Sequence, residues 1–155
     1  MDRQVKELPG RTGDYHILVV DGQGGGIGVR LIRQLAGALP ENCRLLCVGT
    51  NSMATASMLR AGAAQGATGE NAACVQAARA DLILGPVGIV LADGILGEVT
   101  ARMAQAVSSS EAVKILIPSS SCGVRIAGAE DCKLEDALGR AVRLALEEIS
   151  RAAST

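Results

Sequence analysis

The sequence contains almost no aromatic side chains. Tyr15 is the single tyrosine, and neither phenylalanine nor tryptophan occurs among the 155 residues. Nucleic-acid-binding surfaces usually combine aromatic rings, on which bases stack, with an excess of positive charge. Here 15 Lys and Arg residues are balanced by 16 Asp and Glu residues, so the net charge is close to zero. Both absences argue against binding to nucleic acid, and we expect no nucleic-acid partner.

Long apolar runs and a disulfide framework are also missing. No apolar run is long enough for a signal-peptide core or a membrane-spanning helix, so we expect no membrane partner. The five cysteines are odd in number and lack the spacing of a disulfide framework. This usage favours reduced thiols in the cytoplasm and predicts no metal site among the cysteines. Cys122, in a serine-rich loop, is the one cysteine with a candidate functional role.

The clearest functional signal is a glycine-rich segment between an apolar run and a helical pattern. Residues 17–20 form the apolar run, and residues 27–39 repeat apolar side chains at helical spacing. Between them lie Asp21, Gly22, Gln23, Gly24, Gly25, Gly26, Ile27 and Gly28. Glycines let a phosphate approach the backbone, and the free N–H groups at a helix start attract its charge. The segment therefore predicts a site for a nucleotide or a phosphorylated metabolite.

The segment departs from the loops of nicotinamide-dependent enzymes. Ile27 stands where the dinucleotide fingerprint has its third glycine. The loop of short-chain dehydrogenases fits better, but their Tyr-x-x-x-Lys pair is missing, because Val19 lies four residues after Tyr15. A dinucleotide site also places a carboxylate about 20 residues after the loop. The strand expected there is followed instead by a hydroxyl, an amide and a second hydroxyl, from Thr50, Asn51 and Ser52.

Apolar strands alternate with helical patterns along the whole chain, which indicates a parallel sheet covered on both faces. We expect strands near residues 16–21, 44–49, 63–68, 81–85 and 114–118, and an edge strand at 123–127. We expect helices near residues 26–39, 52–62, 69–78, 93–107 and 134–149, with Asp93 as the cap of the fourth. The segment 86–92 fits either a loop or a short strand. The predicted fold is a single-domain α/β, doubly wound, mostly parallel, Rossmann-like three-layer sandwich over residues 15–152, after a flexible tail of residues 1–14.

Further candidate ligand-binding residues follow the other strands. The carboxyl ends of parallel strands lie at one edge of a sheet, and ligands bind in the crevice there. Beside the glycine-rich segment and residues 50–52, this edge is expected to hold Gly69, Glu70, Asn71, Gly85, Pro86 and Gly88. Asp21 is a carboxylate next to the expected phosphate. It could accept backbone N–H groups and hold the loop, coordinate Mg²⁺, or bind a ribose or a cationic group, and we favour the first role.

Several of these segments together are similar to a small bacterial family, domain of unknown function 3842. The similarity rests on residues 21–28, 48–52, 67–72, 85–90, 93–103 and 114–118. It extends over roughly residues 16–145. It implies a single Rossmann-like domain of bacterial origin and carries no catalytic residues over to this chain.

Two functional hypotheses remain open. In the first, the chain is a binding or regulatory module that senses a nucleotide or a phosphorylated metabolite. In the second, it is a small nucleotide- or NAD(P)-dependent enzyme with Glu70, Asp93 or Glu98 as acid–base groups and Asp21 as an Mg²⁺ ligand. The sequence contains one histidine, no P-loop and no lysine in the crevice segments. These absences favour binding over catalysis.

Composition also bears on self-association. Glycine reaches 19 residues and alanine is abundant, so packed surfaces are built from small and aliphatic side chains. Such surfaces suit a tight homodimer, which we expect, although close packing inside one chain explains the composition equally well.

Overall fold

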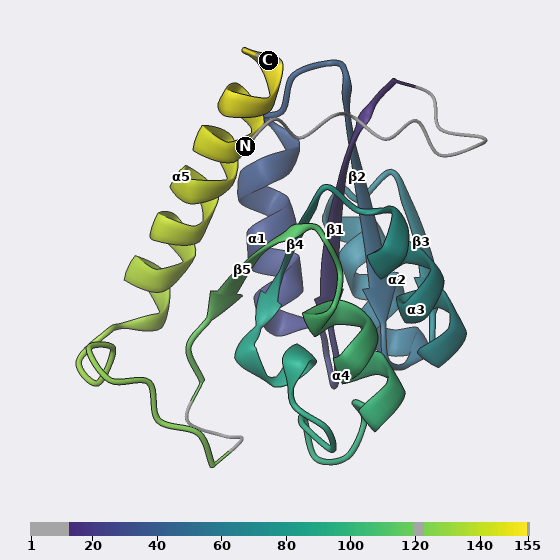
Figure 1. Cartoon of the computed structure of the whole chain (residues 1–155), viewed down its shortest axis with the longest axis vertical. Coiled ribbons are helices and arrows are strands. Elements are labelled where there is room, and N and C mark those ends of the chain that lie inside the picture. Colours follow the sequence, from purple (N-terminus) through teal and green to yellow (C-terminus); the bar gives the residue numbers. More distant parts are fainter. Residues whose placement is uncertain (1–12, 120–122, 155) are drawn as a thin grey trace.

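A computed structural model describes residues 13–119 and 123–154, in which strands and helices alternate (Figure 1). The strands are β1 (Tyr15–Asp21), β2 (Cys43–Gly49), β3 (Gln65–Thr68), β4 (Leu82–Pro86) and β5 (Val113–Ile117). The helices are α1 (Gly26–Ala36), α2 (Ser52–Ala61), α3 (Glu70–Arg79), the short 3-10 helix η1 (Val87–Val90), α4 (Ala101–Ser108) and α5 (Leu134–Ala153). Most of the expected tail, residues 1–12, lies outside the described residues, and so does Cys122.

The strands form one parallel sheet in the order β3-β2-β1-β4-β5. β1 lies in the centre, and all seven of its residues pair with β2, from Tyr15 opposite Cys43 to Asp21 opposite Gly49. Residues 17–20 of β1 are at most 1% exposed, because helices cover both faces of a parallel sheet and its central strand is apolar throughout. The strand order reverses between β1 and β4. This doubly wound sheet confirms the predicted fold class.

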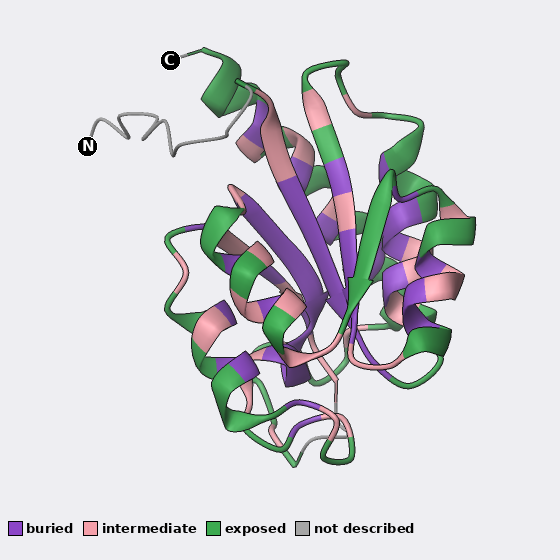
Figure 2. Cartoon of the chain, turned by 90° about the vertical axis from the view of Figure 1, so that its right-hand side faces the viewer, coloured by how far each residue is buried: buried purple, intermediate pink, exposed green. Residues whose placement is uncertain are grey.

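Two helical layers complete the sandwich. One layer contains α1, α2 and α5, which pack on the side of the sheet that carries Ile17 and Val19. The other contains α3 and α4, which pack on the side of Leu18 and Val20. Figure 2 shows the buried central strands between helices whose outer surfaces are exposed, whereas the edge strand β3 is itself exposed. Alternate residues of β1 thus serve two cores, as side-chain alternation in a strand requires.

The fourth helix begins later than the sequence predicts. α4 starts at Ala101, and its cap is Thr100, whose Oγ1 accepts a hydrogen bond from the Met103 N–H at 3.1 Å. Asp93 lies in the left-handed region with a φ of 63°, so the prediction that it caps a helix was wrong. Gly94 in this turn packs so closely against the Gly88 carbonyl that a Cβ on it would collide with the carbonyl oxygen.

Two ambiguous segments are resolved. Residues after β4 form the 3-10 helix η1 rather than a strand, and the polypeptide then turns through residues 91–99. The edge strand expected at 123–127 is wrong: within the described part of the chain the sheet ends at β5. Most of that segment is exposed, with Ile126 at 39%, so it buries too little apolar surface to extend the sheet.

Candidate functional site

The glycine loop, residues 21–28, connects β1 to α1 at the carboxyl edge of the sheet. The structural requirement for glycine differs from one position of the loop to the next. Gly25 caps α1 with a φ of 73°, a conformation that favours glycine. Gly28 allows α1 to approach α2, because a Cβ there would lie 2.5 Å from Met58 Sδ. A Cβ at Gly24 or Gly26 would meet no described atom within 4 Å, and neither residue has a positive φ. Neither packing nor backbone geometry in the described chain requires glycine at these two positions.

Asp21 lies under the loop and holds it in place. The side chain is buried, and its two oxygens accept the N–H groups of Gly22 and Gly28, each at 2.7 Å. Burial raises the pKa of Asp21, and the hydrogen bonds from Gly28 and Gly22 oppose this rise. The geometry agrees with the loop-holding role that the sequence favours. Within residues 13–119 and 123–154, no three His, Cys, Asp or Glu side chains are grouped to hold a metal ion.

Glu98 contacts the loop on its exposed side, at Gln23. Its two carboxylate oxygens share the N–H of Gln23, each at 3.1 Å. Oε1 also accepts hydrogen bonds from Thr50 Oγ1 at 2.7 Å and from Asn51 Nδ2 at 2.6 Å. These hydrogen bonds, those of Thr50 and Asn51 first, lower the pKa of Glu98 and stabilise its ionised form. Three uncharged donors from two strand ends therefore converge on one carboxylate.

A compact turn, residues 93–99, positions Glu98. Three non-glycine residues of this turn lie in the left-handed region: Asp93 at 63°, Ile95 at 53° and Leu96 at 52°. The turn is closed by the Gly97 N–H, which donates to the Asp93 carbonyl at 3.1 Å, and by the Val99 N–H, which donates to the Gly94 carbonyl at 3.1 Å. Ile95 lies over the start of the glycine loop, since a Cβ at Gly22 would be 3.0 Å from its Cγ2.

The end of β2 adjoins the loop as expected. The Thr50 N–H donates to the Asp21 carbonyl at 3.0 Å. Asn51 caps α2 through Oδ1, which accepts the Ala54 N–H at 2.9 Å, and its Nδ2 also donates to the Gln23 carbonyl at 2.8 Å. Ser52, the first residue of α2, is exposed. The structure thus brings Thr50 and Asn51 against the glycine loop.

The ends of β3 and β4 are connected to other parts of the fold. Glu70 accepts a hydrogen bond from Thr100 Oγ1 at 2.6 Å, so it is bound to the residue that caps α4 and not to the glycine loop. Asn71 is exposed, and the Gly69 N–H donates to the Gly49 carbonyl at 2.9 Å. A Cβ at Gly85 would collide with the Val20 carbonyl. Pro86 and Gly88 are buried with this strand end. Packing explains Gly85, whereas the described contacts connect none of these residues to the loop.

The sequence did not predict that Glu98 contacts the glycine loop. The sequence suggested it as an acid–base group, but its hydrogen bond to Gln23 joins residues 75 positions apart. Two local signals pointed to a turn rather than a helix around it: Gly94 and Gly97 interrupt the segment, and Thr100 is a good cap immediately before α4.

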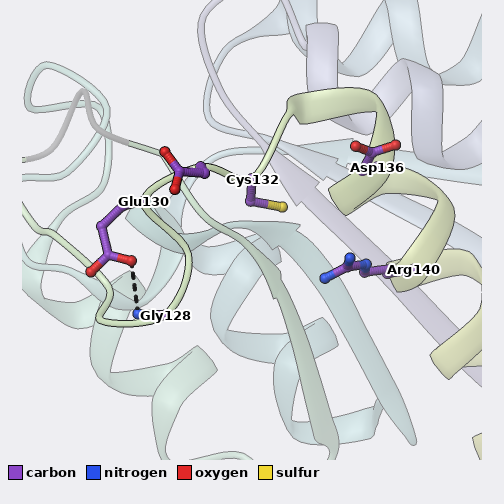
Figure 3. Close-up of a pocket in the computed structure, with 6 residues that line it drawn as sticks. Gly128, Glu130, Cys132, Asp136 and Arg140 are labelled. Carbon is purple, nitrogen blue, oxygen red and sulfur yellow. Dashed lines mark hydrogen bonds between the residues drawn. The ribbon is translucent and has the colours of Figure 1, made fainter.

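A polar hollow of about 210 Å³ lies elsewhere, at the start of α5 (Figure 3). Its walls are formed by Gly128, Glu130, Asp131, Cys132, Asp136 and Arg140. Glu130 is turned toward the backbone and accepts the Gly128 N–H at 3.1 Å. None of the predicted ligand-binding residues lines this hollow.

The strand order and the loop after β1 define a Rossmann-like α/β protein. Residues 16–150 match the family model described as domain of unknown function (DUF3842), and the chain belongs to this family. No curated protein sequence matches the chain. Among the described residues, no helix is long and apolar enough to cross a membrane.

One similar solved structure is a dodecameric FMN-dependent UbiX-like decarboxylase from Escherichia coli O157:H7. The two chains share 18% sequence identity with a TM-score of 0.47, over 88% of this chain and 94% of the decarboxylase chain. This likeness says nothing about the activity or the assembly of the present chain.

Proposed function

We propose that this chain binds a small phosphorylated ligand, most simply a nucleotide, at the glycine loop and acts as a binding or regulatory module. Gly24 and Gly26 carry the proposal. Their N–H groups donate to no oxygen of the described residues, and the space beside their Cα atoms is open. Since neither packing nor conformation requires glycine there, close approach of a ligand is the remaining reason for these two residues.

The start of α1 suits an anion. The helix has 11 residues, its first turn contains no acidic residue, and its cap Gly25 provides no side-chain oxygen. The first N–H groups of a helix lack partners within the helix and lie at the positive end of its dipole. A phosphate would supply acceptors at this point. Asp21 already satisfies the N–H groups on the underside of the loop, which supports a loop that is formed before the ligand binds.

The neighbouring carboxylates favour binding over catalysis. Asp21 is buried and occupied by two backbone N–H groups. Glu98 is held in its ionised form by three donors, and a carboxylate with a lowered pKa is a weak general base. His16 lies in β1 near the opposite end from the loop. A nucleotide- or NAD(P)-dependent enzyme is therefore the less supported alternative.

Self-association belongs to the same proposal. The composition, rich in small residues and nearly free of aromatic ones, favours close contact between two copies, and α5 exposes Leu134 at 40% and Leu144 at 49%. We propose a homodimer. Light scattering at micromolar concentration should give twice the mass of the chain, and a monomer mass would contradict the proposal.

The ligand is testable by thermal stabilisation. ATP, GTP, FMN, NAD, NADP and ribose 5-phosphate are added separately, each with and without Mg²⁺. A ligand at 100 times its dissociation constant should stabilise the folded chain by about 2.7 kcal/mol, enough to raise Tm by several degrees. Gly26→Val places a side chain in the open space beside the loop and should abolish this shift.

Gly139→Ala is the matched control. Gly139 is exposed on α5, and a Cβ there also meets no described atom within 4 Å. This variant should retain the full ligand-induced shift. The proposed function fails if none of the compounds stabilises the wild-type chain, or if Gly26→Val responds to them as the wild type does.

A further inference from the structure

The residues that follow β2 include no carboxylate, but the carboxylate of Glu98, from the turn before α4, lies against them. Glu98 contacts Thr50 and Asn51, which follow β2, and Gln23 in the glycine loop. We propose that Glu98 is a specificity-determining residue that accepts hydrogen bonds from a vicinal diol of the ligand. The site would then take ribonucleotides and reject ligands with a second anionic group at the diol. This inference rests on the proposed function and narrows its ligand class.

Glu98 has acceptor capacity left for a ligand. An ionised carboxylate offers about four acceptor positions on its two oxygens. Oε1 accepts hydrogen bonds from Thr50 and Asn51. In the described part of the chain, Oε2 accepts only the Gln23 N–H, which it shares with Oε1 at 3.1 Å. The Glu98 side chain is also partly exposed, so a hydroxyl group of a ligand can reach Oε2.

The charge of Glu98 determines which ligand groups suit it. Its partners are a backbone N–H, a hydroxyl and an amide, all uncharged. No ion pair with Lys, Arg or His is formed by Glu98 in the described residues. The charge is thus stabilised but not neutralised. It attracts the hydroxyl donors of a diol and repels a phosphate attached to that diol, and such repulsion is an effective way to exclude the wrong ligand.

Glu98 and the expected phosphate donors lie along the same loop. Gln23, which bonds Glu98, immediately precedes Gly24, whose N–H is directed to no described oxygen. One ligand can therefore meet both groups, with its phosphate at residues 24–26 and its hydroxyl groups at Glu98. A nucleotide has both groups in one molecule.

The turn fixes Glu98 before a ligand arrives. Non-glycine residues in the left-handed region are costly, yet Ile95 and Leu96 both adopt it. Ile95 is held against Gly22, and hydrogen bonds close the turn on both sides of Gly97. An acceptor placed by rigid backbone loses little freedom on binding, which favours selectivity.

The test uses two ligand pairs that differ only at the diol. Dissociation constants of ATP and 2′-deoxy-ATP, and of NAD and NADP, are measured by calorimetry. The wild-type chain should bind the first member of each pair about tenfold or more tightly, as expected for a hydrogen bond to a charged acceptor. Glu98→Gln should still bind these ligands but should reduce both ratios to less than about threefold, because a neutral amide no longer repels the 2′-phosphate.

Glu130→Gln is the matched control, because Glu130 is a carboxylate that also accepts a backbone N–H, from Gly128, and none of its described hydrogen bonds reaches the glycine loop. It should preserve both ratios. The proposal is overturned if the wild type binds these ligands without discriminating within the pairs. It is equally overturned if Glu98→Gln binds all four more tightly, since Glu98 would then block the anion site. If no nucleotide binds the wild type, the proposed function itself fails.

Discussion

The glycine loop contacts one carboxylate on its buried side, here called the inner face, and another on its exposed side, the outer face. The two carboxylates differ in burial and in the direction of their pKa shifts. On the inner face Asp21 is 5% exposed, and burial raises its pKa. On the outer face Glu98 is partly exposed, and its hydrogen bonds lower its pKa. Asp21 has Gly28 as a neighbour, where a side chain does not fit, whereas Gly26 opens to free space. The inner face thus holds the loop, and the outer face is exposed.

This difference follows from access to water. A buried donor that loses its acceptor has no replacement, whereas water replaces the acceptor of an exposed donor. The same type of hydrogen bond should therefore contribute much more to stability on the inner face than on the outer face.

The largest expected difference between the two faces is in the stability lost when the carboxylate is removed. Asp21→Ala leaves the N–H groups of Gly22 and Gly28 without their acceptor. At about 1–3 kcal/mol for each donor, the free energy of unfolding should fall by about 2–6 kcal/mol. Glu98→Ala should lower it by less than about 1 kcal/mol, because the hydrogen bonds of Glu98 are exposed or only partly buried and water can replace the lost acceptor. Urea denaturation measures the free energy of unfolding of both variants. Equal decreases in the two would contradict the distinction between the two faces.

The two glycines sharpen the comparison with a smaller effect. Gly28→Ala introduces a Cβ 2.5 Å from Met58 Sδ and 3.1 Å from Asp21 Cβ, and Met58 is fully buried. Overpacking of this kind should cost about 1–3 kcal/mol. Gly26→Ala meets no described atom and should stabilise the chain by about 0.4–1 kcal/mol, because alanine restricts the unfolded state. Melting curves of the two variants should shift in opposite directions.

The smallest expected effect is on the pH dependence of folding stability, and the two carboxylates change it in opposite directions. The pKa of Asp21 is raised from its ordinary 3.8, so the folded chain binds more protons just above that pH and its stability falls as pH rises. The pKa of Glu98 is lowered from 4.5, so its contribution is present above that pH and is lost as pH falls. Asp21→Asn should move the pH of maximum stability upward and Glu98→Gln downward. Urea midpoints between pH 3 and pH 7 test this, and shifts in the same direction would contradict it.

The fold was predictable because its signals are local or follow general rules of chain connection. Residues 17–20 are apolar throughout, as a central parallel strand requires, and the glycine loop marks the turn into α1. The role of Asp21 was also within reach, since its two partners lie one and seven residues away. The inner face of the loop is therefore encoded almost entirely within residues 21–28.

The outer face was not predictable in the same way. Ile95, Val99 and Met103 repeat at helical spacing, which predicts a helix from Asp93, yet the chain turns there and only Met103 lies on α4. The apolar side chains are buried by a turn instead of a helix, and periodicity alone does not distinguish the two. Four strands, three α-helices and the 3-10 helix η1 precede Glu98 in the chain, so no short sequence motif predicts its position beside the loop.

The central position of β1 also has a consequence for how the chain folds. β1 pairs with β2 on one side, and on the other its residues 17–19 pair with residues 82–84 of β4. During synthesis from the N-terminus, β1, β2 and β3 emerge with their helices well before β4 does. Until β4 arrives, one edge of β1 presents unpaired backbone N–H and C=O groups, which are a template for pairing with another chain. Fragments that end before residue 82 keep this edge open and should aggregate, whereas chains that include β4 close it.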